Sequence, residues 1–267
     1  MIRIAVIGAG GRMGREVIKA ILNEQQSLLT AALCRKNDTL LGIDTGKLIN
    51  GTKTGVTVTD NPEKVMQSAD ALIDFTTPQT TLSLLPLCQQ YNKGIVIGTT
   101  GFSVEEKQTI QVAAKSIPIV FAPNMSTGVN LMFKLLQVAA KTLGKHSDIE
   151  IIEKHHRNKQ DAPSGTALKM GEIIADVLNR SLNQHAVYGR HGTKQGIRPR
   201  ETIGFSSIRA GDIVGEHTAL FAGEGEQIEI THTSSSRNHY AAGAVQAALW
   251  LANKTSGLYD MMDVLDL

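Results

Sequence analysis

The feature that most constrains the fold of this chain is a glycine-rich turn, Gly8-Ala9-Gly10-Gly11-Arg12-Met13-Gly14, between an apolar run and an amphipathic run. The apolar run, Ile2–Ile7, is typical of a parallel strand covered on both faces, and Arg12–Asn23 has helical periodicity. A plain strand-to-helix turn needs one or two glycines, whereas this turn has four in seven residues. The strict dinucleotide-binding pattern has its third glycine at position 13, which is Met13 here, and Gly14 takes that place as a variant of the pattern. The turn therefore predicts a dinucleotide site, in which free N–H groups at the helix N-terminus bind the pyrophosphate.

Strand-like and helix-like runs alternate through the first half of the chain. Further strand-like runs are Leu28–Leu33, Val56–Thr59, Ala69–Phe75, Gly94–Gly98 and Ile117–Phe121. Helix starts are marked by Asn61-Pro62, by Thr77-Pro78 and by a capping box of Ser103 and Glu106. This alternation predicts a parallel sheet built from right-handed βαβ units.

The second half of the chain has a different pattern, in which three strands follow one another. Helix-like runs are Asn130–Leu143, Ser164–Asn179 and Tyr240–Leu251, and strand-like runs are Asp148–Lys154, Ile203–Arg209, Ile213–Phe221 and Gln227–Thr233. Consecutive strands indicate an antiparallel or mixed sheet in a separate substrate domain. The predicted fold class is α/β, with a Rossmann-type parallel-sheet domain and a second α+β domain that has a mixed sheet.

The composition excludes several classes of protein. The 267 residues carry 27 Lys and Arg against 25 Asp and Glu, a net charge of +2 that argues against a polyanion binder held by gross charge. Aromatic residues make up only 4%, so a base-stacking nucleic-acid platform is not expected. Two cysteines exclude a disulfide framework and a cysteine-rich zinc site, and no apolar run approaches the ~18 residues of a membrane span. We expect a cytoplasmic protein without a secretory leader.

The end of the second strand bears on the choice of cofactor. An acidic residue there would bind the ribose 2′-OH of NAD, whereas this chain has Cys34-Arg35-Lys36. Two adjacent cations suit a 2′-phosphate, so we expect NADPH to bind better than NADH. Two alternatives remain: the cations can belong to a solvated loop, and Asp38 can reach the ribose from that loop.

The segment from Glu153 to Thr166 has the highest density of chemically active groups. It ends a strand with His155 and His156, continues through Lys159, and opens a helix at Ser164-Gly165-Thr166. Capping side chains and a free helix N-terminus favour an anion, and titratable groups lie close to them in the sequence. The segment predicts binding of a small carboxylate beside a proton donor. Structural histidines and a solvated basic loop are the alternatives, and 189–200 is a second basic loop, either a lid or solvated.

A metal site is not expected, because adjacent histidines on a strand do not readily chelate one ion. Two other segments belong near the cofactor because they follow predicted parallel strands, where ligands bind. These segments are Ile97-Gly98-Thr99-Thr100-Gly101 and Ala122-Pro123-Asn124-Met125-Ser126-Thr127-Gly128.

Together, the glycine turn, Gly98–Phe102, Glu153–Thr166, Arg209–His217 and Asp263–Leu267 resemble the 4-hydroxy-tetrahydrodipicolinate reductase (dihydrodipicolinate reductase) family over essentially the whole chain. The resemblance implies a homotetrameric oxidoreductase that reduces a cyclic dicarboxylate with NADPH or NADH, on the diaminopimelate route to lysine. It implies a nucleotide domain of residues 1–126 and 236–267, because the final helix returns to that domain. Residues 127–235 would form the substrate-binding and tetramerisation domain.

The resemblance also implies roles for individual residues. His155 is expected as proton donor or acceptor and Lys159 as proton donor, with His156, Gly165 and Thr166 as ligands of the substrate carboxylates. The expected cofactor contacts are Gly8, Ala9, Gly10, Gly11, Arg12, Met13, Cys34, Arg35, Gly98, Thr99, Thr100, Ala122, Pro123, Asn124 and Met125. Some family members have an acidic residue where Cys34 stands, which again favours NADPH.

Two alternatives to this function are a different two-domain Rossmann reductase and a non-catalytic NADP-binding sensor. An aldehyde dehydrogenase needs a cysteine nucleophile beside a base, and neither Cys34 nor Cys88 has a suitable place. A sensor would keep the glycine turn without needing His155 and Lys159 together.

Overall fold

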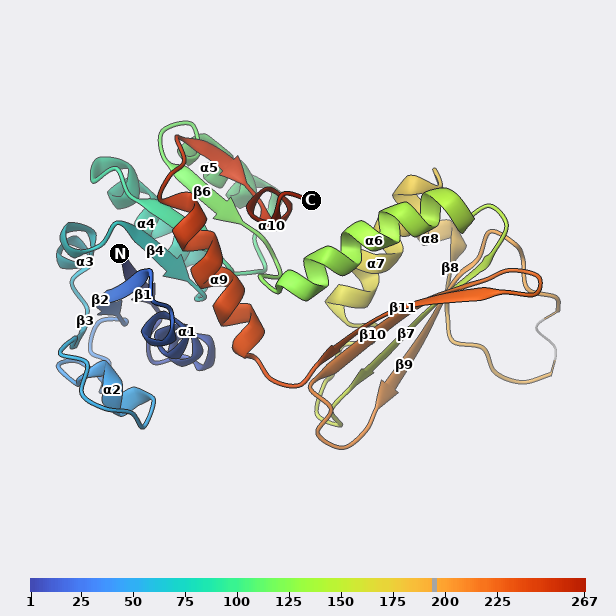
Figure 1. The fold of residues 1–267 in the computed structure, drawn as a ribbon, viewed down its shortest axis with the longest axis horizontal. Coiled ribbons are helices and arrows are strands. Elements are labelled where there is room, and N and C mark those ends of the chain that lie inside the picture. The colour runs from blue at the N-terminus through green and yellow to red at the C-terminus, as the bar shows by residue number, and fades with distance from the viewer. Residues whose placement is uncertain (194–195) are drawn as a thin grey trace. The chain divides into compact units, whose positions relative to one another are not determined.

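A computed structural model describes residues 1–193 and 196–267 of the chain, which form two compact units (Figure 1). The first unit is Met1–Thr127 with Arg237–Leu267, and the second is Gly128–Ser236. Each unit has its own sheet.

The first unit contains a seven-stranded sheet in the order β12-β6-β5-β4-β1-β2-β3, in which every neighbouring pair is parallel. Its strands are β1 (Ile2–Ile7), β2 (Ser27–Leu33), β3 (Val58–Thr59), β4 (Ala71–Asp74), β5 (Gly94–Ile97), β6 (Pro118–Phe121) and β12 (Gly257–Tyr259). Its helices are α1 (Arg12–Asn23), α2 (Thr45–Leu48), α3 (Pro62–Ser68), α4 (Pro78–Gln90), α5 (Val104–Ala113), α9 (Asn238–Leu251) and α10 (Met261–Leu265). The predicted parallel sheet is confirmed.

Both faces of this sheet are covered by helices, because alternate residues of the strands enter two separate cores. In β1, Ile4 and Val6 pack with α1, α9 and α10, whereas Ala5 and Ile7 pack with α3, α4 and α5. The predicted helix starts are confirmed: Asn61, Thr77 and Ser103 each accept a main-chain N–H bond as N-caps.

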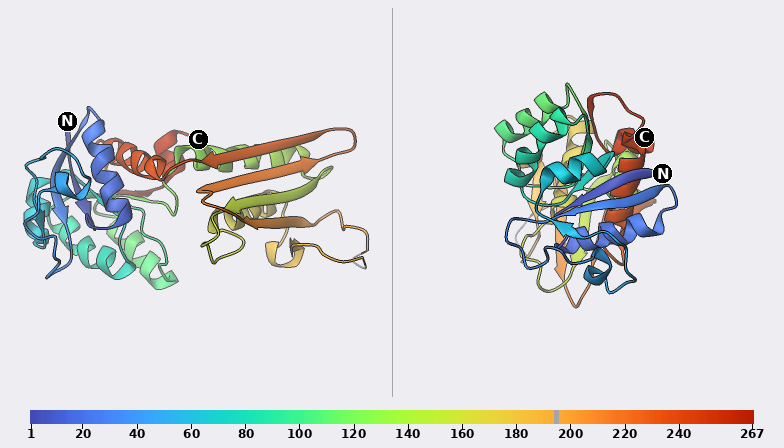
Figure 2. Two further views of the ribbon diagram at one scale, coloured as in Figure 1. Left: turned by 90° about the horizontal axis from the view of Figure 1, so that it is seen from below. Right: turned by 90° about the vertical axis from the view of Figure 1, so that its left-hand side faces the viewer.

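The second unit contains a five-stranded sheet in the order β11-β10-β7-β9-β8. Its strands are β7 (Asp148–His155), β8 (Ala186–Tyr188), β9 (Ile203–Arg209), β10 (Gly215–Ala222) and β11 (Gln227–Ser234). Its helices are α7 (Gly165–Val177), α8 (Leu182–His185) and α6 (Thr127–Leu143), whose first residue belongs to the first unit. The sheet is mixed, since β10 is antiparallel to both neighbours and β9 is parallel to both of its own. Helices α6 and α7 lie on one face (Figure 2).

The structure corrects several predicted boundaries. Strand β7 continues one residue beyond the predicted end, to His155, because pairing with β9 continues to the pair His155 and Arg209. Helix α6 begins at Thr127 and not at Asn130, and β10 begins at Gly215 and not at Ile213. Strands β8 and β12, with three residues each, were not predicted because so short a run shows no periodicity.

Candidate functional site

The glycine turn lines a cavity of about 610 Å³ in the first unit. Gly8 has a φ of +75°, and a β-carbon there would lie 2.6 Å from the methyl carbon of Thr76. Gly14 allows α1 to approach the turn, since a β-carbon would lie 2.9 Å from Cα of Ala9. Gly11 precedes α1 without a side-chain cap, so the N–H groups of the first helical turn receive no side-chain bond. The turn therefore offers bare backbone donors, and a dinucleotide pyrophosphate fits there.

The end of β2 forms another part of this cavity and contributes Cys34 and Arg35. The Arg35 side chain is 88% exposed and pairs with Asp38, whose other oxygen accepts the N–H of Leu40. Burial raises the pKa of the Cys34 thiol above its usual value, which keeps it protonated. The cavity therefore presents an exposed cation at the end of β2.

Only some of the predicted cofactor residues line this cavity. Those that do are Gly8, Gly10, Gly11, Cys34 and Arg35. Ala9 is fully buried, Met13 packs against the core and Arg12 is exposed outside the lining. Gly98, Thr99, Thr100 and 122–125 lie beyond the ends of β5 and β6, and Ala122 and Met125 belong to the core.

Sequence reasoning missed the wall that follows β4. Phe75, Thr76, Thr77 and Thr80 line the cavity, and the rule that ligands bind beyond parallel strands would have found them. The buried Asp74 holds this wall by accepting bonds from Thr76 Oγ1 at 2.6 Å and Thr81 Oγ1 at 2.5 Å. Burial raises the pKa of Asp74.

Thr99 is bonded to this wall, since its Oγ1 accepts the Thr76 N–H at 2.9 Å. The side chain of Thr99 thus supports the loop after β4.

In the second unit, His155 is held by a carboxylate on its own strand. Its Nδ1 lies 2.5 Å from Oε2 of Glu153, and both side chains are buried. Arg209 on β9 donates to both Glu153 oxygens, from Nη1 at 2.9 Å and Nη2 at 2.7 Å. Glu153 lies two residues before His155, on the same face of the strand, and this spacing was the signal that could have revealed it.

Burial and neighbouring charges set the protonation of this group. Burial alone would raise the pKa of Glu153, but bonds from Arg209, Ser207 and His155 outweigh it and lower that pKa to about 2. Burial lowers the pKa of His155, and the bond to Glu153 opposes this shift. Glu153 is therefore a carboxylate beside a histidine that is neutral above its lowered pKa.

His217 on β10, which was not a predicted site residue, joins this group to α7. Its ring lies 5.0 Å from that of His155, between centroids, and its Nε2 lies 2.9 Å from Ser164 Oγ. Ser164 also accepts the N–H of Ala167 as the N-cap of α7, as predicted. Burial lowers the pKa of His217 to about 4, so its ring is neutral at pH 7. The predicted anion site at Gly165 thus lies beside a neutral histidine pair.

The other predicted substrate residues lie in the loop between β7 and α7. Lys159 Nζ donates to both carboxylate oxygens of Asp161, at 2.8 and 2.9 Å. The buried Nδ1 of His156 has no hydrogen-bond partner within residues 1–193 and 196–267. Gly165 begins α7 with open space where a side chain would be. The second unit therefore brings the start of α7 together with His155.

Two arginines of the basic loop, Arg190 and Arg198, form ion pairs at the other end of β7. Arg198 donates to Glu150 at 3.1 Å and to Asp148 at 2.7 Å, and Arg190 donates to Glu150 at 2.9 Å. These ion pairs fix the two arginines to the start of the strand that ends at His155, while most of the described residues of the loop are exposed to solvent. Lys194 lies outside the described residues.

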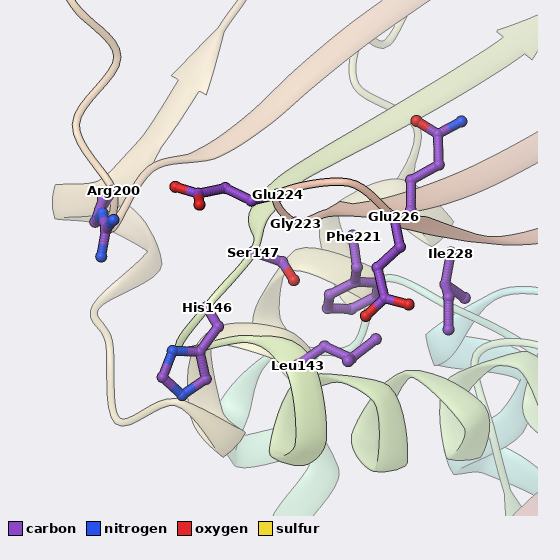
Figure 3. Close-up of a pocket in the computed structure, with 10 residues that line it drawn as sticks. Leu143, His146, Ser147, Arg200, Phe221, Gly223, Glu224, Glu226 and Ile228 are labelled. Carbon is purple, nitrogen blue, oxygen red and sulfur yellow. The ribbon is translucent and has the colours of Figure 1, made fainter.

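A second cavity, of about 380 Å³, lies beside the turn between β10 and β11 (Figure 3). His146, Arg200, Glu224 and Glu226 line it together with apolar side chains. It contains none of the predicted site residues. In the described part of the chain no cluster of three His, Cys, Asp or Glu can hold a metal ion, and no helix has the length and apolar character to cross a membrane.

Comparison with known proteins covers both units. The family models described as dihydrodipicolinate reductase, N-terminus and C-terminus, match residues 2–125 and 128–265. The chain is 56% identical to the 4-hydroxy-tetrahydrodipicolinate reductase of Pseudomonas fluorescens and 54% identical to that of Hahella chejuensis, each over 100% of both chains. A solved structure, the dipicolinate-bound dihydrodipicolinate reductase from Paenisporosarcina sp. TG-14, superposes with a TM-score of 0.79 at 31% identity over 98% of each chain. The two family models together span nearly the whole chain, which therefore belongs to the dihydrodipicolinate reductase family.

Proposed function

We propose that this chain reduces 4-hydroxy-2,3,4,5-tetrahydrodipicolinate to 2,3,4,5-tetrahydrodipicolinate with loss of water, on the diaminopimelate route to lysine. Identity of 54–56% to reductases of that name over the full chain supports this reaction most strongly. The presence of His155, Lys159 and the open start of α7 in one unit supports an enzyme rather than a cofactor sensor.

A reduced nicotinamide cofactor supplies the hydride when it is bound, and the residues of the chain position both reactants. Gly8, Gly10 and Gly11 would hold the pyrophosphate against α1. Predicted contacts beyond β5 and β6, from Gly98 to Thr100 and from Ala122 to Met125, extend the same carboxyl edge of the sheet.

In the second unit, the N–H groups of Gly165 and Thr166 and the ring of His156 would bind the substrate carboxylates. An anion is stabilised at this helix N-terminus, because Ser164 caps only one of its donors. Lys159 would exchange its ion pair with Asp161 for one with the substrate and donate a proton, and His155 would donate or accept a proton through Nε2. Such proton transfer accounts for about 10²–10⁴-fold in rate.

We further propose that NADPH binds better than NADH. The exposed guanidinium of Arg35 suits a 2′-phosphate, and the protonated thiol of Cys34 cannot replace a carboxylate on the ribose diol. Asp38 was the alternative that could reach the ribose, but its carboxylate already accepts hydrogen bonds from Arg35 and from the N–H of Leu40.

The units suggest distinct roles. We assign nucleotide binding to residues 1–126 and 236–267, and substrate binding and tetramerisation to 127–235. Strand alternation places Ile152 and the 43% exposed Ile208 on the face opposite to Phe205, which lies beside Gly171 of α7, and these apolar side chains support contact with other copies. Light scattering at the mass of four chains would support a homotetramer, and a monomer mass would exclude it. We expect the enzyme in the cytoplasm.

The reaction is tested by NADPH oxidation with the purified protein. The substrate is made in the cuvette by a synthase from pyruvate and aspartate semialdehyde, and NADH is used in a parallel run. Rapid oxidation that depends on the synthase product establishes reaction and substrate together. NADPH binding without turnover would instead support the sensor.

A further inference from the structure

Glu153 and Arg209 form a largely buried ion pair next to His155. The Glu153 side chain is 1% exposed and the Arg209 side chain 19%. A buried ion pair by itself is weak support for a stabilising role, since desolvation offsets much of its attraction. The other hydrogen bonds of Glu153 and Arg209 are more informative, because they connect the ion pair to His155 and Lys159, the two side chains proposed to transfer protons.

The first of these bonds joins Glu153 to His155. Arginine can only donate, and the Glu153 carboxylate accepts from Arg209 and from the ring Nδ1. The carboxylate therefore places the ring proton of neutral His155 on Nδ1. Nε2 is left for the substrate, and Gly215 leaves space for it, since a β-carbon there would lie 3.1 Å from this atom.

The second bond joins Arg209 to the loop that carries Lys159. Arg209 Nη2 donates to the main-chain oxygen of Asp161 at 2.6 Å, and the carboxylate of Asp161 accepts from Lys159. The same loop is tied to the turn after β9, because Arg157 N–H donates to the Gly211 oxygen at 3.2 Å. The Arg209 guanidinium therefore contacts both Glu153, which bonds His155, and Asp161, which bonds Lys159.

We propose that Arg209 and Glu153 are positioning residues for the reaction proposed above: Arg209 orients His155 through Glu153 and Lys159 through the main chain of Asp161. This role requires the planar guanidinium of arginine, because Nη1 and Nη2 both donate to the Glu153 carboxylate and Nη2 also donates to the main-chain oxygen of Asp161. The charged and titratable groups facing His155 are Glu153 on its own strand, Arg209 on β9, His217 on β10 and Lys159 in the loop.

The test uses Glu153→Gln and Arg209→Lys in the full chain. In Glu153→Gln, the amide oxygen accepts from Arg209 and its NH₂ faces His155, so the ring proton is expected to move to Nε2. The pKa of His155 falls, because Glu153 opposes the effect of burial in the wild type. In both variants kcat should fall about 10²-fold, within the range of proton-transfer contributions. KM for NADPH should stay within about twofold, because cofactor selectivity lies in the other unit.

Arg198→Lys is the matched control, since Arg198 also pairs with a glutamate of β7, Glu150, at the end away from His155. It should retain wild-type kcat. The proposal is wrong if Arg209→Lys and Glu153→Gln retain kcat within about threefold, or lose no more than the control loses.

A second measurement does not depend on turnover or on the stability of a variant. In the wild-type protein, the ¹⁵N chemical shifts of the labelled His155 ring should show that the neutral ring carries its proton on Nδ1. A proton on Nε2 would overturn the proposal. If the wild type shows no turnover with the synthase product, the proposed function fails while these shifts still decide the positioning role.

Discussion

His217 Nε2 lies 2.9 Å from Ser164 Oγ, and this contact joins strand β10 of the mixed sheet to the N-cap of α7. The same hydroxyl accepts the Ala167 N–H. One side chain therefore determines both the start of the helix and the partner of a buried histidine, in the place proposed for the substrate carboxylates.

Ser164→Ala should weaken substrate binding. Loss of the cap costs about 1 kcal/mol of helix stability and leaves Nε2 of His217 buried without this partner. We expect KM for the substrate to rise about tenfold, while the dissociation constant of NADPH stays unchanged. Ser181→Ala is the control, because Ser181 precedes α8 without a side-chain cap bond. Equal substrate KM in the two variants would contradict a role for Ser164 in binding.

Lys159→Met should lower kcat by about 10²–10³-fold, since the proposed proton donor is removed while the apolar stem is retained. The measurement is steady-state NADPH oxidation with the synthase product. Lys169→Met serves as the control, because Lys169 forms an exposed ion pair with Glu172 on α7. Near-normal turnover of Lys159→Met would exclude Lys159 as the donor.

Arg35→Gln should weaken NADPH binding by about tenfold and leave NADH binding unchanged, because only the 2′-phosphate needs this cation. Titration calorimetry measures both constants. The exposed Lys64 on α3 gives a control of equal charge change, Lys64→Gln. Cys34→Asp should shift selectivity toward NADH by placing an acceptor at the ribose. If the wild type binds both cofactors equally well, the proposed selectivity is incorrect.

Acid should destabilise the second unit in two separate windows. His217 has its folded pKa lowered by burial to about 4, so protons bind the unfolded state more tightly. Stability is therefore lost as pH falls from about 6.5 through about 4. Glu153, with a folded pKa of about 2, keeps its contribution above about 4.5 and loses it below that value.

Urea unfolding at pH 7 and pH 5 examines the first window. The unfolding free energy should be about 1–2 kcal/mol lower at pH 5, and His217→Gln should reduce this difference. His155 and His232, whose pKa values are also lowered by burial, contribute with the same sign. An unfolding free energy that rises toward pH 5 would contradict the assignment of a neutral buried His217.

Local patterns predicted most of the first unit correctly. The apolar run Ile2–Ile7, the glycines after it and the capping pairs at Asn61 and Thr77 act over a few residues, so their structures follow from neighbours in the chain. The resemblance to the family was carried by such contiguous segments and was confirmed by the family models.

The partners of His155 could not be read from the sequence in the same way. Glu153 is two residues away, and strand alternation places it on the same face. Arg209 is 56 residues from Glu153 and meets it through the parallel register of β7 with β9. His217 lies opposite Glu153 through the antiparallel register of β7 with β10.

Residue type and spacing along the chain are thus sufficient to predict the strand-turn-helix order, the glycine turn and the histidine segment. These features depend on the conformational preferences of neighbouring residues and on the electrostatics of helix ends. The contact of Glu153 with His155 Nδ1, the neutrality of His217 and the ion pairs of Arg190 and Arg198 arise only in the folded sheet. Burial and strand register bring distant charges within bonding distance there, and a shift of one residue would turn Arg209 to the other face.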